Sequence, residues 1–382
     1  MKVLYVFRSL AVWGGIERIL VDKMNCLADM YGMEVYMLTS DQGTHPVPYQ
    51  LSDRVQVEDL GICFHHQYQY SGLRRFMVRR SMRHRYQQLL ASRLQTIKPD
   101  VMVCTTADQL DLLLKVKGGI PLVVESHSIC TRTLADLGHC WLLRKWRSRR
   151  FLRSLSRAEV LVALTEGDAQ QWRKYHSHVM VIPNFISHWE STVSPLTSQR
   201  AIFVGRLDEQ KCVQDAIRVW RIVQEVHPDW VLDIYGDGEM REEIASLAAG
   251  VGGVHLHQPT GQIFECYRQS SFLMQTSLYE PFGLVIIEAM SCGLPVVAYD
   301  CPYGPASLIT DQSNGFLIKE RDISAFAEKV CALIERQAMR TEMGKEARLS
   351  SQAYDAKVVM DLWKVLFERL TVPNKNTPLD EK

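Results

Sequence analysis

The chain has 382 residues, 47% of them hydrophobic and 23% charged, which exceeds one typical domain and excludes a largely disordered protein. Its net charge is only +1, but residues 1–187 carry 25 Lys+Arg against 16 Asp+Glu, whereas residues 188–382 carry 19 against 27. The ten cysteines form no CxxC pair, and no run of about 18 apolar residues occurs, so neither a disulfide framework, a structural zinc site nor a membrane span is expected. We expect a cytoplasmic protein of two domains whose halves contact different partners.

Short β-branched runs alternate with amphipathic stretches along the first half, a pattern typical of a parallel sheet covered by helices. The expected strands are residues 3–7, 35–38, 101–104, 122–125, 160–163 and 179–182, and the expected helices include 15–31 and 73–94.

The pattern lapses into polar residues over 183–199, which indicates a linker, and then starts again. Strands are expected at 201–204, 231–235, 254–256, 272–275 and 295–299. The sequence thus predicts an α/β protein with two Rossmann-like, doubly wound domains, residues 1–186 and 187–355, facing each other across a cleft. A terminal helix, about 356–372, could pack back on the first domain. Ligands of such sheets bind beyond the carboxyl ends of the strands.

Residues 12–18, Val-Trp-Gly-Gly-Ile-Glu-Arg, follow the first strand and open a helix. Gly15 and its neighbour permit close approach of a ligand, and a helix start offers donors to phosphate. The segment is not a G-x-G-x-x-G fingerprint, which argues against a dehydrogenase. Glu17 and Arg18 could instead pair with one another or with the helix surface.

His127 follows the strand 122–125 within the segment Glu-Ser-His. A lone histidine is more often a structural residue, but a position at the end of a strand favours contact with a ligand.

Two basic stretches stand out in the first half. Residues 73–93 contain seven arginines and no acid, and residues 141–157 contain six arginines and Lys145, again without an acid. Both could be solvated helix faces, but uncompensated charge among tryptophans and leucines favours an anionic surface, either a membrane or an acceptor. The residues we assign to this patch are Arg147, Arg149 and Arg150. No recognition motif accompanies the charge, so nucleic acid is not expected.

Two motifs follow strands in the second half. Residues 204–211, Val-Gly-Arg-Leu-Asp-Glu-Gln-Lys, bring Arg206 and Lys211 to a strand end, where two cations suit a diphosphate. Residues 235–239, Tyr-Gly-Asp-Gly-Glu, combine Asp237 with glycines that allow close backbone approach and a left-handed turn.

Residues 279–290, Tyr-Glu-Pro-Phe-Gly-Leu-Val-Ile-Ile-Glu-Ala-Met, follow the strand 272–275. A turn at Pro-Phe-Gly and a helix over 284–291 place Glu280 at the strand end. The amides of Phe282, Gly283 and Leu284 are then helix-start donors, suited to phosphate or sugar oxygens.

Glu288 lies in the apolar helix that follows. It could pair structurally, or it could accept the hydroxyls of a ribose, as acidic residues do at other nucleotide sites. A second glutamate across the turn favours the functional alternative.

These motifs, in this order, resemble the retaining glycosyltransferase family 4 of the GT-B type, bacterial polysaccharide transferases of group 1 included. The family signature is two glutamates separated by seven residues, matched by Glu280 and Glu288. One departure is Cys212, where the family usually has glycine after the lysine. The resemblance implies that Glu280 lies beside the donor sugar, Glu288 holds the ribose, and Asp237 borders the base. It implies that Arg206 and Lys211 bind the diphosphate.

The resemblance also implies that His127 donates a hydrogen bond to the donor sugar and that the loop of Gly15 lines the cleft. The implied reaction transfers a hexosyl or N-acetylhexosaminyl group with retention, from a nucleotide sugar to a glycan or lipid-diphosphate-linked acceptor in surface polysaccharide synthesis. Attack on the front face, with the leaving phosphate accepting the proton, requires no metal or other cofactor. Peripheral attachment to the cell membrane would fit such an acceptor.

Two alternatives remain. A sugar-nucleotide epimerase would share the fold, and a non-catalytic partner subunit would be expected to have lost the donor residues, which are present here. A glycan phosphorylase would usually require a longer chain and a lysine that binds pyridoxal phosphate. Residues 300–305, Asp-Cys-Pro-Tyr-Gly-Pro, are similar to those of polysaccharide transferases that use UDP-sugars, which favours UDP over GDP.

Overall fold

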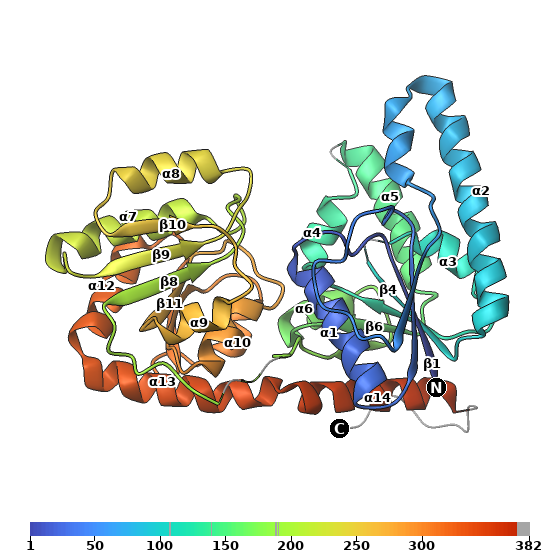
Figure 1. The fold of residues 1–382 in the computed structure, drawn as a ribbon. Helices are drawn as coiled ribbons and strands as arrows, with labels where there is room; N and C mark the ends of the chain where they lie inside the picture. Colours follow the sequence, from blue (N-terminus) through green and yellow to red (C-terminus); the bar gives the residue numbers. More distant parts are fainter. Residues whose placement is uncertain (107, 139, 188, 190, 373–382) are drawn as a thin grey trace. The chain divides into compact units, whose positions relative to one another are not determined.

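The computed structural model describes residues 1–106, 108–138, 140–187, 189 and 191–372. The chain divides into two compact units (Figure 1). Unit 1 consists of Met1–Ile182 and the residues from Val359 on, and unit 2 is Pro183–Val358.

Unit 1 is built on a parallel sheet of seven strands in the order β3-β2-β1-β4-β5-β6-β7. The central strands are continuous apolar runs buried on both faces, as expected where helices cover a parallel sheet. The strands are β1 (Lys2–Phe7), β2 (Glu34–Thr39), β3 (Val55–Asp59), β4 (Val101–Thr105), β5 (Leu122–Glu125), β6 (Val160–Ala163) and β7 (Val179–Val181).

The helices of unit 1 are α1 (Gly15–Asp29), η1 (Phe64–Gln69), α2 (Gly72–Ile97), α3 (Leu110–Val116), α4 (Cys130–Ala135), α5 (Trp141–Leu155) and α6 (Glu166–Trp172). The last helix, α14 (Ala356–Thr371), begins in unit 2 and continues into unit 1. Helix α1 buries the stripe Ile19, Leu20, Met24 and Leu27, whose spacing of three and four residues is that of an amphipathic helix. Lys23 lies on the same buried stripe.

Unit 2 has a parallel sheet of six strands in the order β10-β9-β8-β11-β12-β13. Its strands are β8 (Arg200–Val204), β9 (Val231–Tyr235), β10 (Val254–His257), β11 (Phe272–Gln275), β12 (Val296–Tyr299) and β13 (Gly315–Ile318). Its helices are α7 (Val213–Val226), α8 (Arg241–Ala249), α9 (Ile263–Arg268), α10 (Leu284–Ser291), α11 (Gly304–Leu308), α12 (Ile323–Glu335), α13 (Gln337–Ser351) and η2 (Gln352–Tyr354).

Each sheet reverses its order at one point, between β1 and β4 in unit 1 and between β8 and β11 in unit 2. At such a switch point the loops after the two strands diverge and leave space for a ligand. The predicted α/β class with two doubly wound, Rossmann-like units is confirmed.

The sequence did not predict β3 and β13. In β3 the side chains from Val55 to Glu58 are buried, exposed, exposed and partly buried, so no clean alternation marks the strand. The strand β13 begins at Gly315, a residue that normally weakens a strand. A Cβ on Gly315 would lie 2.4 Å from the Val296 carbonyl oxygen, so close strand packing requires glycine there.

Candidate functional site

The loops after β8 and β11 meet at the switch point of unit 2. The Leu278 amide donates to the Gln210 carbonyl at 2.9 Å, and the Thr276 hydroxyl donates to the carbonyls of Lys211 and Cys212 at 3.1 and 2.9 Å. These bonds join two segments about 70 residues apart in the chain, consistent with the neighbouring positions of their strands.

Lys211 and Glu280 form an ion pair at this junction. The Lys211 Nζ lies 3.1 Å from Oε2 of Glu280 and contacts Oε1 as well. Both side chains are largely buried, with 13% and 5% of their surface exposed. The stem of Lys211 packs against Gly205, where an added Cβ would lie 3.3 Å from it. Removal of one partner alone from a buried pair of this kind strongly destabilises the folded protein, because the other charge is left buried without a partner.

Arg206 lies in the same loop but is exposed, with 64% of its side chain accessible. Its Nη2 lies 3.1 Å from Asp208 and donates to the Gln210 side chain at 2.9 Å. Gln210 in turn donates to the Tyr279 carbonyl at 3.1 Å. The loop therefore offers one buried and one exposed cation beside Glu280.

Cys212 ends this loop in the left-handed conformation, with φ +47°. The departure from glycine therefore keeps the backbone conformation that glycine favours. The Cys212 side chain is buried, and burial raises the pKa of its thiol to about 11.

Glu280 is fixed through its backbone as well. Its amide donates to the Pro302 carbonyl at 2.7 Å, and its carbonyl accepts from Tyr303 and Gly304 at 2.9 and 2.8 Å. A Cβ on Gly304 would lie 2.0 Å from the Phe282 carbonyl oxygen, so the segment after β12 approaches the turn too closely for any other residue.

The helix α10 begins directly after this turn, as predicted, with Gly283 at φ +104°. Phe282 is buried and packs edge-on against Tyr354, with ring centroids 5.6 Å apart. Within the described part of the chain, the amides of Phe282, Gly283 and Leu284 donate no backbone hydrogen bond. They are therefore available to a bound anion.

Glu288 lies inside α10 and is buried. The Tyr267 hydroxyl donates to its Oε2 at 3.2 Å. The structure thus gives this carboxylate at least one protein partner.

Asp237 follows β9 in a loop that packs on the loop after β8. Its carbonyl accepts from the Leu207 amide at 2.9 Å, while its side chain is 60% exposed and 3.9 Å from Arg241. The predicted left-handed turn is wrong, because neither Gly236 nor Gly238 has a positive φ. Both glycines instead permit contact between loops, since their Cβ atoms would lie 1.9 and 2.5 Å from the carbonyl oxygens of Gly205 and Leu207.

In unit 1, His127 belongs to a buried charged cluster at the end of β5. Its Nε2 lies 2.9 Å from Oε2 of Glu125, and the same oxygen is paired with Lys23. Burial alone would raise the pKa of Glu125, but the Lys23 and His127 side chains hold it at about 2. Burial lowers the pKa of His127, so its ring is neutral at pH 7.

Lys23 was not predicted from the sequence. The signal was available, because a lysine on a buried apolar stripe requires an anionic partner. The Lys23 ammonium also lies 4.5 Å from the Trp363 ring centroid, which belongs to α14.

Gly15 is the exposed first residue of α1, and Gly14 precedes it as the helix N-cap. The Gly14 carbonyl accepts from the Tyr49 hydroxyl at 3.1 Å, and the exposed Trp13 packs edge-on against the Tyr49 ring. Arg18 lies 3.8 Å from Asp22 on the helix surface, as the structural alternative predicted.

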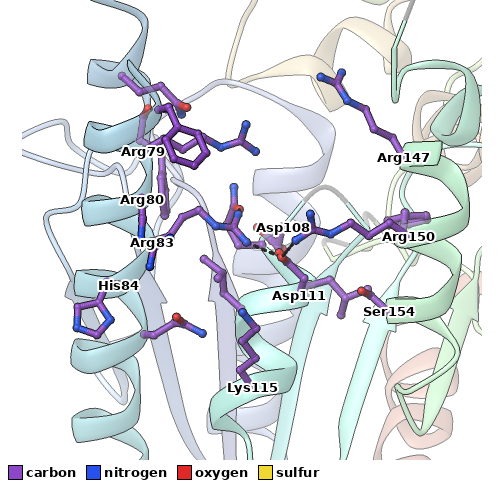
Figure 2. Close-up of a pocket in the computed structure, with 18 of the residues that line it drawn as sticks. Arg79, Arg80, Arg83, His84, Asp108, Asp111, Lys115, Arg147, Arg150 and Ser154 are labelled. Atoms are coloured by element: carbon purple, nitrogen blue, oxygen red, sulfur yellow. Dashed lines mark hydrogen bonds and ion pairs between the residues drawn. The ribbon is translucent and has the colours of Figure 1, made fainter. Parts of the chain in front are cut away.

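A groove of about 1370 Å³ lies between α2, α3 and α5 in unit 1 (Figure 2). The three arginines that the sequence analysis assigned to one patch do not all line this groove. Arg147 and Arg150 line the groove, whereas Arg149 is exposed and is not part of the lining.

Three residues of unit 2 could ligate a metal. Asp233, His255 and His257 offer ligand atoms within 4.8 Å of one another. His255 is paired with Asp233 across β10 and β9, and His257 lies on the same face two residues later. One carboxylate oxygen lies 2.7 Å from His257, and the other accepts from Arg200 at 2.7 Å. We expected no cluster of possible metal ligands, but the strand register brings these three side chains together; the His-x-His alternation was the signal missed.

The predicted donor residues thus fall into two groups. Arg206, Lys211, Glu280 and the start of α10 lie together in unit 2, with Asp237 on an adjoining loop. His127 and Gly15 lie in unit 1, His127 just after β5 and Gly15 at the start of α1. Among the described residues, no helix is both long and apolar enough to cross a membrane.

Two protein-family models match the chain. Residues 13–189 match the model described as Glycosyltransferase Family 4, and residues 187–350 match Glycosyl transferases group 1. The chain is 28% identical over 286 residues to an exopolysaccharide phosphotransferase of Streptomyces coelicolor, a match that covers 72% of this chain and 29% of that protein. It is 28% identical over 194 residues to a poly(ribitol-phosphate) alpha-N-acetylglucosaminyltransferase of Staphylococcus aureus, covering 50% of this chain and 39% of the relative. The chain therefore spans less than half the length of both relatives.

Solved structures share the fold over nearly the whole chain. A point mutant of S. aureus TarM, solved in complex with fondaparinux, alpha-GlcNAc-glycerol and UDP, has a TM-score of 0.75 at 16% identity. The match covers 96% of this chain and 99% of the TarM chain.

Proposed function

Because this chain belongs to the family 4 glycosyltransferases, we propose that it is a glycosyltransferase that takes a hexosyl or N-acetylhexosaminyl group from a UDP-sugar. The acceptor in this proposal is a glycan or lipid-linked glycan of a surface polysaccharide, and the donor's anomeric configuration is retained. Matches to glycosyltransferases on both halves favour this function over an epimerase or a non-catalytic subunit.

The observation that carries the proposal is the Lys211–Glu280 pair at the switch point of unit 2. In the proposed complex, Lys211 contacts the leaving diphosphate and Glu280 lies beside the sugar. The pair holds the Lys211 ammonium at the strand end, so a cationic group is already positioned where the diphosphate would bind.

Arg206 and the amides at the start of α10 complete the proposed phosphate site. Arg206 is exposed and its guanidinium presents several donors, so it can turn toward a bound diphosphate. Negative charge grows on the β-phosphate as the glycosidic bond breaks. Lys211, Arg206 and the amides of Phe282 to Leu284 would stabilise that charge, and the phosphate would accept the proton of the attacking hydroxyl.

Glu288 and Asp237 have the roles of ribose and base neighbours in this proposal. The bond from the Tyr267 hydroxyl fixes one oxygen of the Glu288 carboxylate, which orients the group that would accept the ribose hydroxyls. His127 is neutral and its single N–H donates to Glu125, so in this proposal its Nδ1 would accept a hydrogen bond from the ligand instead of donating one, and Gly15 would let the chain approach the ligand closely.

The proposed mechanism requires no metal, since cationic side chains and amides serve the diphosphate. Turnover by the purified enzyme should therefore change less than about twofold after treatment with EDTA. A requirement for added Mg²⁺ or Mn²⁺ would contradict this part of the proposal.

UDP is the proposed nucleotide. Solved structures of similar fold that contain UDP include the TarM mutant, which also holds alpha-GlcNAc-glycerol, and Anabaena Alr3699/HepE. Thermal unfolding with UDP, GDP and their sugar conjugates tests the choice, because a ligand at 100 times its Kd adds about 2.7 kcal/mol of stability. We expect the largest rise in Tm with UDP or a UDP-sugar. Equal rises with GDP, or none with UDP, would contradict it.

We also propose that unit 1 docks on an anionic membrane surface. The start of α5 exposes four large apolar side chains beside its basic residues, and the start of α2 exposes three more; they are Trp141, Leu142, Leu143, Trp146, Leu73, Phe76 and Met77. Amphipathic side chains of this kind, beside basic ones, are typical of helices that enter the headgroup region.

Sedimentation with vesicles of anionic phospholipid tests membrane docking. Replacing Trp141 and Leu142 by serine should reduce binding, and neutralising Arg147, Arg149 and Arg150 should reduce it further at low salt. Unchanged binding in both variants would contradict the proposal.

A further inference from the structure

The groove of unit 1 has a strongly unbalanced lining. Seven permanently cationic side chains reach it against three carboxylates, Asp108, Asp111 and Asp136. The cations are Arg75, Arg79, Arg80, Arg83, Lys115, Arg147 and Arg150. They come from three helices, α2, α3 and α5, that are separate in the sequence, so the fold has concentrated the charge in one hollow.

Asp111 joins the two sides of this groove. It lies at the start of α3 and pairs with Arg83 of α2 and, at 2.9 Å, with Arg150 of α5 (Figure 2). One carboxylate thus holds two guanidinium groups in place. These two arginines are consequently less available to a ligand than the rest.

Other arginines keep donors for a ligand. Within the described ranges, Arg79 and Arg80 have no ion pair, and Arg147 donates to the Leu137 carbonyl at 3.2 Å but pairs with no acid. Arg79 and Arg80 belong to α2 and Arg147 to α5, on opposite sides of the groove (Figure 2). An anion between them would receive hydrogen bonds from both helices.

Size and shape argue for a chain-like ligand. A volume of about 1370 Å³ is larger than the roughly 300–1000 Å³ of an ordinary small-molecule pocket. Aromatic side chains, among them Phe76, Trp146 and Phe151, line the same hollow. They offer apolar surface against which the C–H groups of a ligand chain can pack. A flat bilayer would not fill a hollow of this kind, although it could contact the exposed helix ends beside it.

We propose that this groove binds the phosphate groups of the acceptor, a glycan or polyol chain that carries phosphate esters. Arginine is suited to this ligand because its planar guanidinium can bind two phosphate oxygens at once. The role as acceptor site rests on the proposed transferase function, whereas binding of the phosphate chain does not.

The experiment uses the full chain, a fluorescently labelled glycerol-phosphate oligomer, and a neutral oligosaccharide of equal length. The groove variant carries Arg79→Gln and Arg147→Gln. The control variant carries Arg74→Gln and Arg149→Gln, which remove the same charge from the same two helices at positions outside the lining. Binding is measured by fluorescence anisotropy at low and at physiological salt, and Tm is recorded for each variant.

We expect the groove variant to bind the phosphate oligomer about 10-fold or more weakly, and the control variant to change less than about twofold. The neutral oligosaccharide should bind much more weakly to the native chain. Equal weakening in both variants would show a diffuse charge effect and overturn the proposal. So would equal affinity for the neutral oligosaccharide, or a loss confined to binding of anionic phospholipid vesicles or of single-stranded DNA.

UDP titration of the same variants separates this inference from the proposed function. If the native chain binds the phosphate oligomer but never turns over a UDP-sugar, the groove proposal stands and the proposed transferase function is contradicted. If the chain turns over UDP-sugars but binds no phosphate oligomer, the transferase function stands and the groove proposal is contradicted. Both arginine variants should bind UDP as the native chain does, since neither change touches unit 2.

Discussion

The two units place charge at their strand ends in different ways. In unit 2, the loop after β8 brings the largely buried Lys211 and the exposed Arg206 to the junction with the loop of Glu280. Both cations belong to one short sequence motif, residues 204–211. In unit 1, the charges at the end of β5 are fully buried, and the excess cations lie on helices α2 and α5. From this difference we expect unit 2 to bind a small, defined anion, whereas unit 1 combines a rigid strand end with a broad cationic surface.

The largest effect is expected at the buried pair of unit 2. Lys211→Gln and Glu280→Gln should each lower transfer by about 1000-fold or more, because each removes a charge from the reacting centre. Glutamine is preferred to alanine because it keeps much of the volume of the replaced side chain and a group that can form a hydrogen bond with the remaining partner. Alanine would leave that partner's charge next to an empty cavity. Steady-state release of UDP from UDP-sugar and acceptor measures the loss, and circular dichroism checks the fold. Near-normal turnover in both folded variants would contradict the placement of Lys211 and Glu280 at the reacting centre.

Arg206 sharpens the comparison, because it is exposed where Lys211 is buried. Arg206→Gln should cost about 100-fold in kcat with little change in Tm, since the side chain contributes to the transition state but not to packing. Arg221→Gln, on the exposed face of α7, is the matched control. An equal loss in both variants would point to general charge rather than to the diphosphate site.

The buried cluster of unit 1 predicts a pH dependence. Burial lowers the pKa of His127 below its ordinary 6.5, so as pH falls through 6.5 the unfolded chain takes up the proton first and stability falls. The lowered pKa of Glu125 adds stability above pH 4.5 that is lost toward about pH 2. His127→Gln should therefore flatten the fall in Tm between pH 7 and 5 by about 2–4 °C. Calorimetric scans across this range measure it; a steeper fall in the variant would contradict the cluster.

The smallest effect is expected at Cys212. Glycine there would relieve the left-handed backbone but lose a buried side chain, so Cys212→Gly should change stability by less than about 1 kcal/mol. Transfer should be nearly unchanged, because the loop conformation is already that of glycine. Cys212→Val, with a β-branched side chain at φ +47°, is the contrasting variant and should lower both stability and turnover.

The sequence predicted the parts of the molecule that depend on neighbouring residues. Buried parallel strands are continuous apolar runs, and the turn at Pro-Phe-Gly with its helix follows from local propensity, so Glu280 could be placed at a strand end. The sequence placed Lys211 and Glu280 at strand ends but did not predict their ion pair, because the strand order decides which loops meet.

Other features depend on contacts between distant segments. Lys23 and Glu125 are about 100 residues apart, and the Asp233 cluster needs the register of β9 and β10. The role of Gly236 and Gly238 follows from the approach of a second loop, which local turn rules do not contain. The groove likewise forms only when α3 brings α2 and α5 together, so the sequence showed its charge and not its shape.

Titration of UDP into the native chain, the Arg206→Gln chain and the groove variant tests the division of labour between the units most directly. We predict that Arg206→Gln weakens UDP binding by about 10-fold or more, whereas the double arginine change in unit 1 leaves it within about twofold. Equal weakening by both changes, or UDP affinity unaffected by Arg206→Gln, would contradict a donor site built on the strand-end loops of unit 2.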